Sequence, residues 1–245
     1  MKNYGIGILL NLGWILILTG CLNNSDELSN PLLISTSVFT EDAEGWEAQF
    51  SEYEPGLEDS LKLSFTHDKF MATESIGEVT AVVQSGYAAN SDLFMYIKRQ
   101  ISGFKPNTSY SVVFTLELFA QLNEDFSGDL SDNNNGSFLK AAVYTEEPDT
   151  LTVDDMVNPG KKIVITNFNK GDDRTTGPNM ALIGKLEHTS VDESPLLLIG
   201  TSEGDDLLGT TDNDGKMWMM IGVDTNQPIY QSIFYSFIGI QFREI

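Results

Sequence analysis

The stretch SYSVVFTLELFA, residues 109–120, decides the fold class. Large apolar side chains occupy every second position, whereas Ser111, Thr115 and Glu117 stand between them. Successive side chains of a β-strand point to opposite faces, so this alternation is typical of a strand with one buried face. We expect the buried face to carry Tyr110, Val112, Phe114, Leu116 and Leu118.

Short runs of similar character fill the chain beyond residue 31, separated by clusters of Gly, Pro, Asn and Asp. They span 32–39, 46–53, 61–67, 79–84, 93–102, 138–145, 162–168, 180–188, 195–200, 216–224 and 231–243. About a dozen strands in one chain predict an all-β fold, a two-sheet antiparallel β-sandwich. We expect a polar loop at 123–136 and, at 152–157, at most one helical turn.

Composition restricts the class of protein further. Of 245 residues, 36 are Asp or Glu and 14 are Lys or Arg, which gives a formal charge of −22. Such a chain repels phosphate, which argues against binding nucleic acid and against unaided attachment to an anionic membrane. Hydrophobic residues make up 41%, enough for a sizeable core. No repeat or Pro-rich linker divides residues 32–245, and we expect them to form a single domain.

The amino terminus reads MKNYGIGILLNLGWILILTGC, residues 1–21. Its apolar stretch has the length of a secretory signal and is short for a membrane-spanning helix. The last four residues, Leu-Thr-Gly-Cys, resemble the lipobox of bacterial lipoproteins, in which the cysteine is lipidated and the preceding peptide is removed. The resemblance implies a signal peptide at 1–20, a lipidated Cys21 and a flexible tether over 21–31. The alternative is an ordinary secretory signal or a short anchor helix before Cys21.

The lipoprotein resemblance also implies a location. Several acyl chains on Cys21 would give stable attachment to a membrane. The acidic run Ser25-Asp26-Glu27 is similar to the export signal of surface lipoproteins in Bacteroidetes, although a solvated linker has the same composition. The loop NFNKGD at 167–172 also resembles secreted lipoproteins of such bacteria. We expect a bacterial cell-envelope protein, lipid-anchored to the outer membrane and either surface-exposed or facing the periplasm.

Three segments resemble carbohydrate-binding modules with the galactose-binding-like jelly-roll fold. They are FTEDAEGW at 39–46, LFMYIKRQISGFKPNTSYSVVFTLELFA at 93–120 and SIFYSFIGIQF at 232–242. The resemblance implies a jelly roll that binds an oligosaccharide or polysaccharide. Many such modules hold calcium through an Asp at the entry of the final strand, where this chain has Tyr235 and Ser236. The acidic composition is compatible with calcium, but the sequence does not locate a metal site.

A sugar site requires a flat aromatic surface with a few polar groups around it. Strand alternation selects five side chains that we expect to line one groove if their strands share the concave sheet. They are Tyr96, Lys98, Glu117, Lys140 and Trp218. The alternative for each aromatic is core packing, and for each charged residue a solvated face. Lys140 shares its strand face with Tyr144, and we expect Trp46 to pack inside the sandwich.

The sequence contains no complete catalytic constellation. Residues 200–204 fit the pattern G-x-S-x-G, but the residues after Ser202 indicate a loop, and both His67 and His188 precede it. Two histidines and one cysteine give no recognisable spacing for a catalytic metal. Strand carboxylates are scarce, Glu117 being the clearest, whereas a glycosidase needs a facing pair. We therefore expect no enzyme activity.

Together these patterns favour a lipid-anchored, non-catalytic glycan-binding protein of the cell envelope. The alternative is a structural or protein-interaction lipoprotein that holds an envelope protein and binds no sugar. A polysaccharide-degrading enzyme ranks third, because it would need converging carboxylates. A solvent-accessible aromatic in a polar groove would favour the first class of protein, and a flat apolar patch would favour the second.

Overall fold

The computed structural model describes residues 32–89, 92–123, 136–172, 175, 177–178, 180–186, 196–202 and 207–245. All regular structure in these ranges is β, as predicted. The described part of the chain holds no helix with the length and apolarity that crossing a membrane would take. The predicted signal peptide, Cys21 and the whole tether lie outside the described residues, as does most of the polar loop predicted at 123–136.

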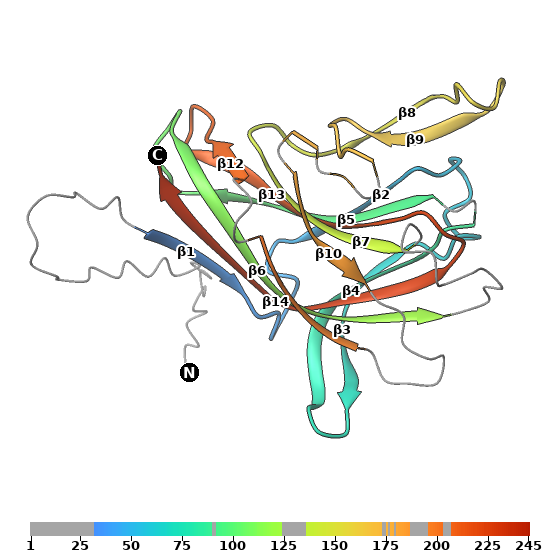
Figure 1. The fold of residues 1–245 in the computed structure, drawn as a ribbon, viewed down its shortest axis with the longest axis horizontal. Helices are drawn as coiled ribbons and strands as arrows, with labels where there is room; N and C mark the ends of the chain where they lie inside the picture. Colours follow the sequence, from blue (N-terminus) through green and yellow to red (C-terminus); the bar gives the residue numbers. More distant parts are fainter. Residues whose placement is uncertain are drawn as a thin grey trace, which may run out of the picture.

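One sheet has seven strands, all paired antiparallel (Figure 1). They are β1 (Leu32–Ser37), β3 (Ser64–Thr73), β4 (Gly77–Tyr87), β6 (Ser109–Asn123), β11 (Leu196–Thr201), β12 (Leu207–Thr210) and β14 (Tyr230–Glu244). The central path runs β11-β6-β14-β4-β3. Strand β1 pairs with the second half of β14, and β12 pairs with the first residues of β6.

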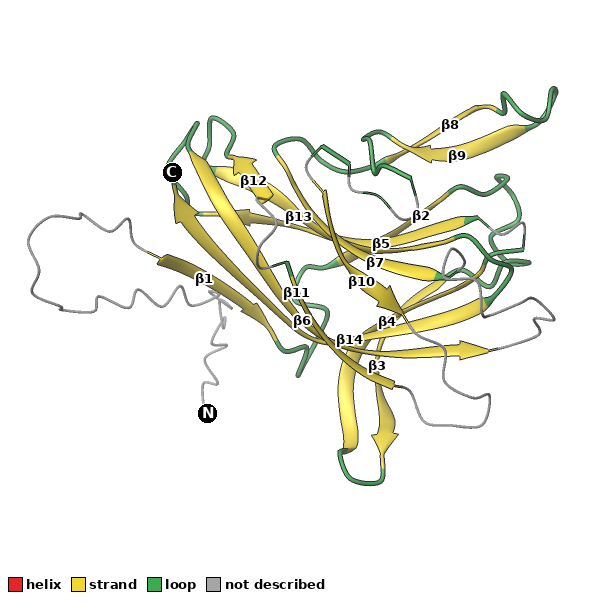
Figure 2. Ribbon diagram, in the orientation of Figure 1, coloured by secondary structure: helices red, strands yellow, loops and turns green. Residues whose placement is uncertain are grey.

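The other large sheet has five strands in the order β10-β7-β13-β5-β2, also antiparallel. They are β2 (Glu47–Ser51), β5 (Leu93–Ser102), β7 (Ser137–Tyr144), β10 (Met180–Leu186) and β13 (Lys216–Thr225). The hairpin of β8 (Thr150–Asp154) with β9 (Lys162–Thr166) is a two-stranded sheet of its own (Figure 2), and backbone hydrogen bonds of Val164 with Glu52 and Tyr53 join it to the residues after β2. The predicted two-sheet antiparallel β-sandwich is thus confirmed.

The main core lies between the two large sheets. The five alternating residues predicted to be buried in β6 are each at most 2% exposed. They meet Met219 and Ile221 of β13, both fully buried, within one apolar cluster. Trp46 also belongs to this cluster, as predicted, and its indole Nε1 donates a hydrogen bond to Ser37 Oγ at 3.0 Å. Burial of these side chains is the main stabilising contribution to the sandwich.

Two strands of the structure differ from the sequence prediction. The helical turn expected at 152–157 is absent, because Thr150–Asp154 pairs with Lys162–Thr166 as strand β8. The segment after Ser202 was expected to be loop throughout, yet Leu207–Thr210 forms β12. In β12, a Cβ at Gly209 would lie 3.1 Å from Val143, so the missing side chain permits close approach of the two sheets. Neither strand carries the long alternation that marks β6.

A β-bulge in β14 decides which of its side chains face outward. The pairing with β6 shifts register between Tyr235 and Phe237. Before the bulge the inward residue is Tyr235, and after it the inward residues are Ile238 and Ile240, so the alternation changes phase. As a result Gln241 and Arg243 point to the outer face of the seven-stranded sheet, and both are exposed.

Candidate functional site

The outer face of the five-stranded sheet, turned away from the main core, is partly covered by chain. On this face Phe94, Tyr96 and Met220 are each 0% exposed and belong to a second apolar cluster. Phe168, from the segment after β9, packs over them with its ring centroid 5.5 Å from that of Tyr96. The apolar cluster therefore forms a floor between the sheet and the 145–172 segment.

Gly222 provides the space for this floor. A Cβ at Gly222 would lie 2.6 Å from the Phe94 ring and 3.0 Å from Cβ of Tyr96. The absence of that atom lets Phe94 and Tyr96 stack, with centroids 5.2 Å apart and planes 24° apart. Because β13 has glycine at position 222, the neighbouring strand β5 can place the rings of Phe94 and Tyr96 over it.

Four of the five predicted ligand-binding residues share this outer face. Tyr96 lies opposite Gly222, which in turn lies opposite Lys140, and Lys98 and Trp218 follow along the same strands. Glu117 does not join them, because β6 belongs to the seven-stranded sheet and its side chain is on the outer face of that sheet. The prediction of one groove shared by all five residues is therefore wrong for Glu117. Alternation assigns a face of a strand but not the sheet to which the strand belongs.

Burial changes what three of these four residues can do. Tyr96 and Lys140 are 0% exposed and Lys98 is 2% exposed, so none of them contacts solvent as the site stands. Trp218 is half-buried and keeps an accessible edge. The Lys98 ammonium lies 5.3 Å from the centroid of the Trp218 ring and 2.6 Å from Glu147 Oε1. Lys98 thus connects the sheet to the covering segment.

Lys140 takes part in a buried charge network beneath the covering segment. Its Nζ lies 2.8 Å from Asp224 Oδ2, and both side chains are 0% exposed. Lys170 Nζ lies 2.8 Å from the same oxygen and 2.9 Å from Glu52 Oε1. Lys140 also donates to the backbone carbonyl of Asp172 at 2.7 Å. Burying these charges is acceptable only because they are paired, and the pairing fixes the 167–172 loop to the sheet.

Glu52 has an altered acidity within this network. Burial raises the pKa of Glu52 to about 8. The Lys170 ammonium opposes this shift, whereas the carboxylates of Asp224 and Asp92 add to it. Glu52 therefore takes up a proton at a pH where an exposed glutamate stays ionised.

Among the described residues, the carboxylates of Glu52, Asp92 and Asp224 form the arrangement that most resembles a metal site. Their carboxylate oxygens lie within 4.8 Å of one another. However, Lys170 Nζ already bridges Glu52 and Asp224, at hydrogen-bond distance from both. Calcium needs several oxygen ligands around one position, and here an ammonium group sits between two of the three. The cluster fits a lysine ion-pair network better than it fits calcium.

A groove opens beside the apolar floor, between the end of β7 and the residue that follows β9. Its volume is ≈ 350 Å³, and it is lined by Tyr144, Thr145, Glu146, Glu147, Pro148, Asn167 and Phe168. The rings of Tyr144 and Phe168 form one wall, with centroids 4.9 Å apart and planes 40° apart. Trp218 lies opposite Tyr144 in the neighbouring strand and flanks the groove. Aromatic walls beside polar groups are typical of small-ligand sites.

The polar side of the groove is acidic and held in place by Asn167. The Asn167 side chain accepts a hydrogen bond from the backbone of Asp149 at 2.9 Å and donates one to the carbonyl of Glu147 at 3.0 Å. Glu146 and Glu147 both line the groove and are exposed. Burial raises the pKa of the Tyr144 phenol, which therefore stays neutral. The groove thus presents carboxylates and rings, and its lining includes no cation.

Phe168, Asn167 and Glu147 were not among the predicted site residues. The NFNKGD segment that contains Phe168 and Asn167 was singled out only as a resemblance, and Tyr144 only as the neighbour of Lys140 on one strand face. The β8–β9 hairpin brings these residues together, because it returns the chain at Asn167 to the end of β7. That return depends on a strand the sequence pattern did not predict.

The surroundings of Ser202 do not form a serine-hydrolase site. Ser202 is 0% exposed, and its Oγ accepts a hydrogen bond from the backbone N–H of Phe114 at 2.9 Å. Its own N–H donates to the carbonyl of Phe114 at 3.0 Å. Ser202 therefore ends β11 by pairing with β6. It holds no position from which it could attack a substrate.

Comparisons with known proteins give distant structural similarities only. No family model matches the chain, and the search of curated proteins gives no match. The mannan-recognising carbohydrate-binding module TmCBM27 is similar with a TM-score of 0.39 and 9% identity, over 87% of this chain and 99% of that one. The xylan-binding module CBM15 gives a TM-score of 0.34 and 13% identity, over 85% and 95% of the two chains.

A third similar structure is the enzymatically active domain of tailspike protein 4 of bacteriophage CBA120. Its TM-score is 0.33 and its identity 9%, and the matched region covers 85% of this chain but 20% of the tailspike chain. This chain therefore spans about one fifth of that protein. Similarities of this size do not define a family, and the candidate site rests on the geometry described above.

Proposed function

We propose that the chain is a non-catalytic glycan-binding protein and that its sugar binds in the groove beside Tyr144 and Phe168. The observation that carries this proposal is the pairing of two aromatic rings with exposed carboxylates around one hollow of ≈ 350 Å³. Rings contact the apolar faces of a sugar, and carboxylates accept hydrogen bonds from its hydroxyls. Trp218 extends the aromatic surface along β13.

The charge of the groove favours neutral sugars. Glu146 and Glu147 line it, and Lys98 is turned toward Glu147 rather than toward open solvent. An acidic sugar would bring a third negative charge into a site without a free cation among its lining residues. Neutral hexose or pentose oligomers are therefore the ligand class that fits.

We also propose that the protein is held in the bacterial cell envelope by lipid on Cys21. The support is the lipobox-like segment at 18–21 and the polar tether that follows it. The first described strand, β1, begins at Leu32, so a tether of this length would separate the folded domain from the membrane. In this arrangement the outer membrane carries the sandwich as a glycan receptor, either at the cell surface or facing the periplasm.

The proposal is tested by a glycan array with the full-length chain, kept in a detergent that has no sugar head group. We expect saturable binding to neutral oligosaccharides, and loss of most of that binding in Trp218→Ala. Phe70→Ala, an aromatic on the outer face of the other sheet, serves as the matched control. A blank array with folded protein would overturn the proposal, as would equal binding by Trp218→Ala.

One observation favours the second candidate function, binding to an envelope protein. Met156 and Val157 at the tip of the β8–β9 hairpin are 93% and 85% exposed. The hairpin projects from the sandwich (Figure 1), and its two exposed apolar side chains offer a contact for another protein. Cross-linking from position 156 in intact cells would reveal such a partner, and a blank glycan array together with a specific cross-link would favour this function.

A further inference from the structure

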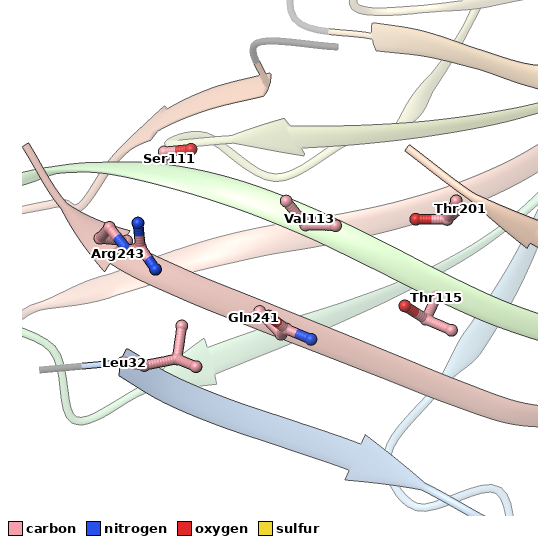
Figure 3. Close-up of a pocket in the computed structure, with 7 residues that line it drawn as sticks. All are labelled: Leu32, Ser111, Val113, Thr115, Thr201, Gln241 and Arg243. Carbon is pink, nitrogen blue, oxygen red and sulfur yellow. The ribbon is translucent and has the colours of Figure 1, made fainter. Parts of the chain in front are cut away.

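A second hollow, shown in Figure 3, lies on the outer face of the seven-stranded sheet, whereas the aromatic groove lies beside the five-stranded sheet. Its volume is ≈ 310 Å³, and its lining is mostly polar. Ser111, Val113 and Thr115 come from β6, Gln241 and Arg243 from β14, Thr201 from β11 and Leu32 from β1. These strands come from widely separated parts of the sequence and meet only in the folded sheet.

On one side of β6 the described pairing is divided between two short strands. Strand β11 pairs with β6 from Ala120 back to Thr115, and β12 pairs with it from Val112 to Ser109. Among the described residues, Val113 lies between these two pairings and has no partner in either strand. On the other side, Gly239 of β14 lies opposite Thr115 and contributes no side chain. A Cβ at Gly239 would lie 3.0 Å from the Phe237 ring, so that ring packs against the glycine, and the hollow is bounded by the seven lining residues named above.

Arg243 is the charged residue of this hollow. It is exposed, and no carboxylate of the described residues forms an ion pair with its guanidinium. Many of the other cations are paired, for example Lys105 with Glu244 at 2.6 Å and Lys161 with Glu54 at 2.8 Å. Among the described residues Lys62, Arg99, Lys162 and Lys185 likewise form no ion pair, but Arg243 is the cation that lines this hollow. A guanidinium recognises carboxylates through two parallel hydrogen bonds.

We propose that this hollow binds an acidic saccharide, with Arg243 holding the sugar carboxylate. The hydroxyls of Ser111 and Thr115 and the amide of Gln241 lie along the same face as Arg243 and supply hydrogen bonds to sugar hydroxyls. Along a strand, side chains of one face repeat every ~6.6 Å, so donors are spread over a length suited to an oligosaccharide. The ligand class is therefore a uronic-acid-containing glycan.

Glu117 limits where the carboxylate can sit. It lies on the same face of β6, one outward position beyond Thr115, and its Oε1 is 3.4 Å from Ser236 Oγ. Its negative charge repels an anion at that end of the hollow. Arg243 lies opposite Ser111, at the other end. A bound uronate is thus oriented with its carboxylate toward Arg243 and its hydroxyls toward Thr115.

The test is a calorimetric titration of the full-length chain, in the same detergent, with an α-1,4-linked galacturonate trisaccharide. Its methyl ester is titrated in parallel, and so are inorganic phosphate and sulfate. The variants are Arg243→Gln, the control Lys69→Gln on another strand of the same sheet, and Trp218→Ala in the aromatic groove. Thermal unfolding checks that each variant is folded.

We expect the trisaccharide to bind saturably, and the affinity to fall at least ~10-fold in Arg243→Gln and for the methyl ester. Lys69→Gln and Trp218→Ala should bind as the unchanged chain does. Unchanged affinity in folded Arg243→Gln would overturn the proposal, and so would equal binding of the ester or no binding at all. Equal affinity for phosphate or sulfate would reduce the hollow to a simple anion site and would also overturn it. Trp218→Ala alters the aromatic groove and leaves the second hollow intact. Binding of the trisaccharide therefore tests the second hollow independently of the neutral-glycan site.

Discussion

The rings of Tyr144 and Phe168 lie 4.9 Å apart, although one belongs to a strand of the five-stranded sheet and the other to the segment that covers it. Their contact joins the sheet to its cover and forms the aromatic wall of the groove. The buried network of Lys140, Asp224 and Lys170 holds the same cover from beneath. The contacts that hold the 167–172 loop on the sheet therefore also form the surface of the aromatic groove.

Removal of Lys140 tests whether the buried network holds the fold. Lys140→Met leaves the Asp224 carboxylate, which is 0% exposed, with one fewer cation. Breaking a buried pair costs roughly 3–5 kcal/mol, and we expect a loss at the lower end because Lys170 remains. Urea unfolding measures the change. Lys161→Met, which breaks an exposed pair with Glu54, should cost no more than about 1 kcal/mol, and equal losses in the two variants would contradict this account.

Glu52 should make stability depend on pH above the range of ordinary carboxylates. Its pKa is about 8 in the folded protein, raised above the ordinary value of 4.5. The folded state therefore holds the proton more tightly, and this contribution to stability is complete below pH 4.5 and disappears as pH rises through 8.

Glu52→Gln removes that titration. Melting temperatures of the variant and the unchanged chain, compared from pH 5 to pH 9, should show the variant gaining relative stability as the pH rises. A difference that stays constant across this range would show that Glu52 titrates normally, and a difference of opposite sign would contradict the raised pKa.

Calcium should not stabilise the unchanged chain. Lys170 Nζ lies within 2.9 Å of both Glu52 and Asp224, between carboxylates that a metal would need. We expect the melting temperature to be the same in calcium and in chelator. Lys170→Met removes the ammonium and leaves the acidic cluster with Asp92, so calcium should raise the melting temperature of this variant. A calcium-dependent increase in the unchanged chain would show that the metal displaces Lys170.

Cys21 should carry lipid when the full chain is expressed in a bacterium that processes lipoproteins. Labelling with an alkyne fatty acid should mark the unchanged chain and leave Cys21→Ser unmarked, because the thiol is the attachment point. Ser25→Ala, in the tether, is the control and should be labelled normally. Label on Cys21→Ser, or none on any form, would contradict the lipoprotein proposal.

Local alternation predicted the burial of β6 because a period of two residues is a property of one strand. Tyr110 and Phe114 are accordingly 2% and 0% exposed. The same rule placed Glu117 with Tyr96, since it contains no information about strand partners. In the structure Thr115 pairs with Gly239, far along the chain, and this pairing puts Glu117 in the other sheet. Sheet membership depends on such distant pairings, which a local pattern does not contain.

Only part of the candidate site could be predicted, because it too depends on contacts between distant segments of the chain. Tyr96, Lys98, Lys140 and Trp218 do share one face, as strand alternation indicates. The sequence pattern did not reveal that Phe168 and Lys170 would cover Tyr96 and Lys140, because that cover depends on the β8–β9 hairpin and on buried ion pairs. Phe168 and Glu147 therefore contribute the accessible surface that Tyr96 and Lys98 were expected to provide.

Titration calorimetry on Phe168→Ala tests the glycan-binding proposal most directly. The ligand is the neutral oligosaccharide that binds best on the array, and Phe70→Ala is the control, since Phe70 also contacts other rings but on the opposite sheet. An aromatic contact contributes about 0.5–1.5 kcal/mol beyond area burial, so we expect the affinity of Phe168→Ala to fall by about tenfold and that of Phe70→Ala to be unchanged. Equal affinities in folded Phe168→Ala and the unchanged chain would contradict the assignment of the groove as the sugar site.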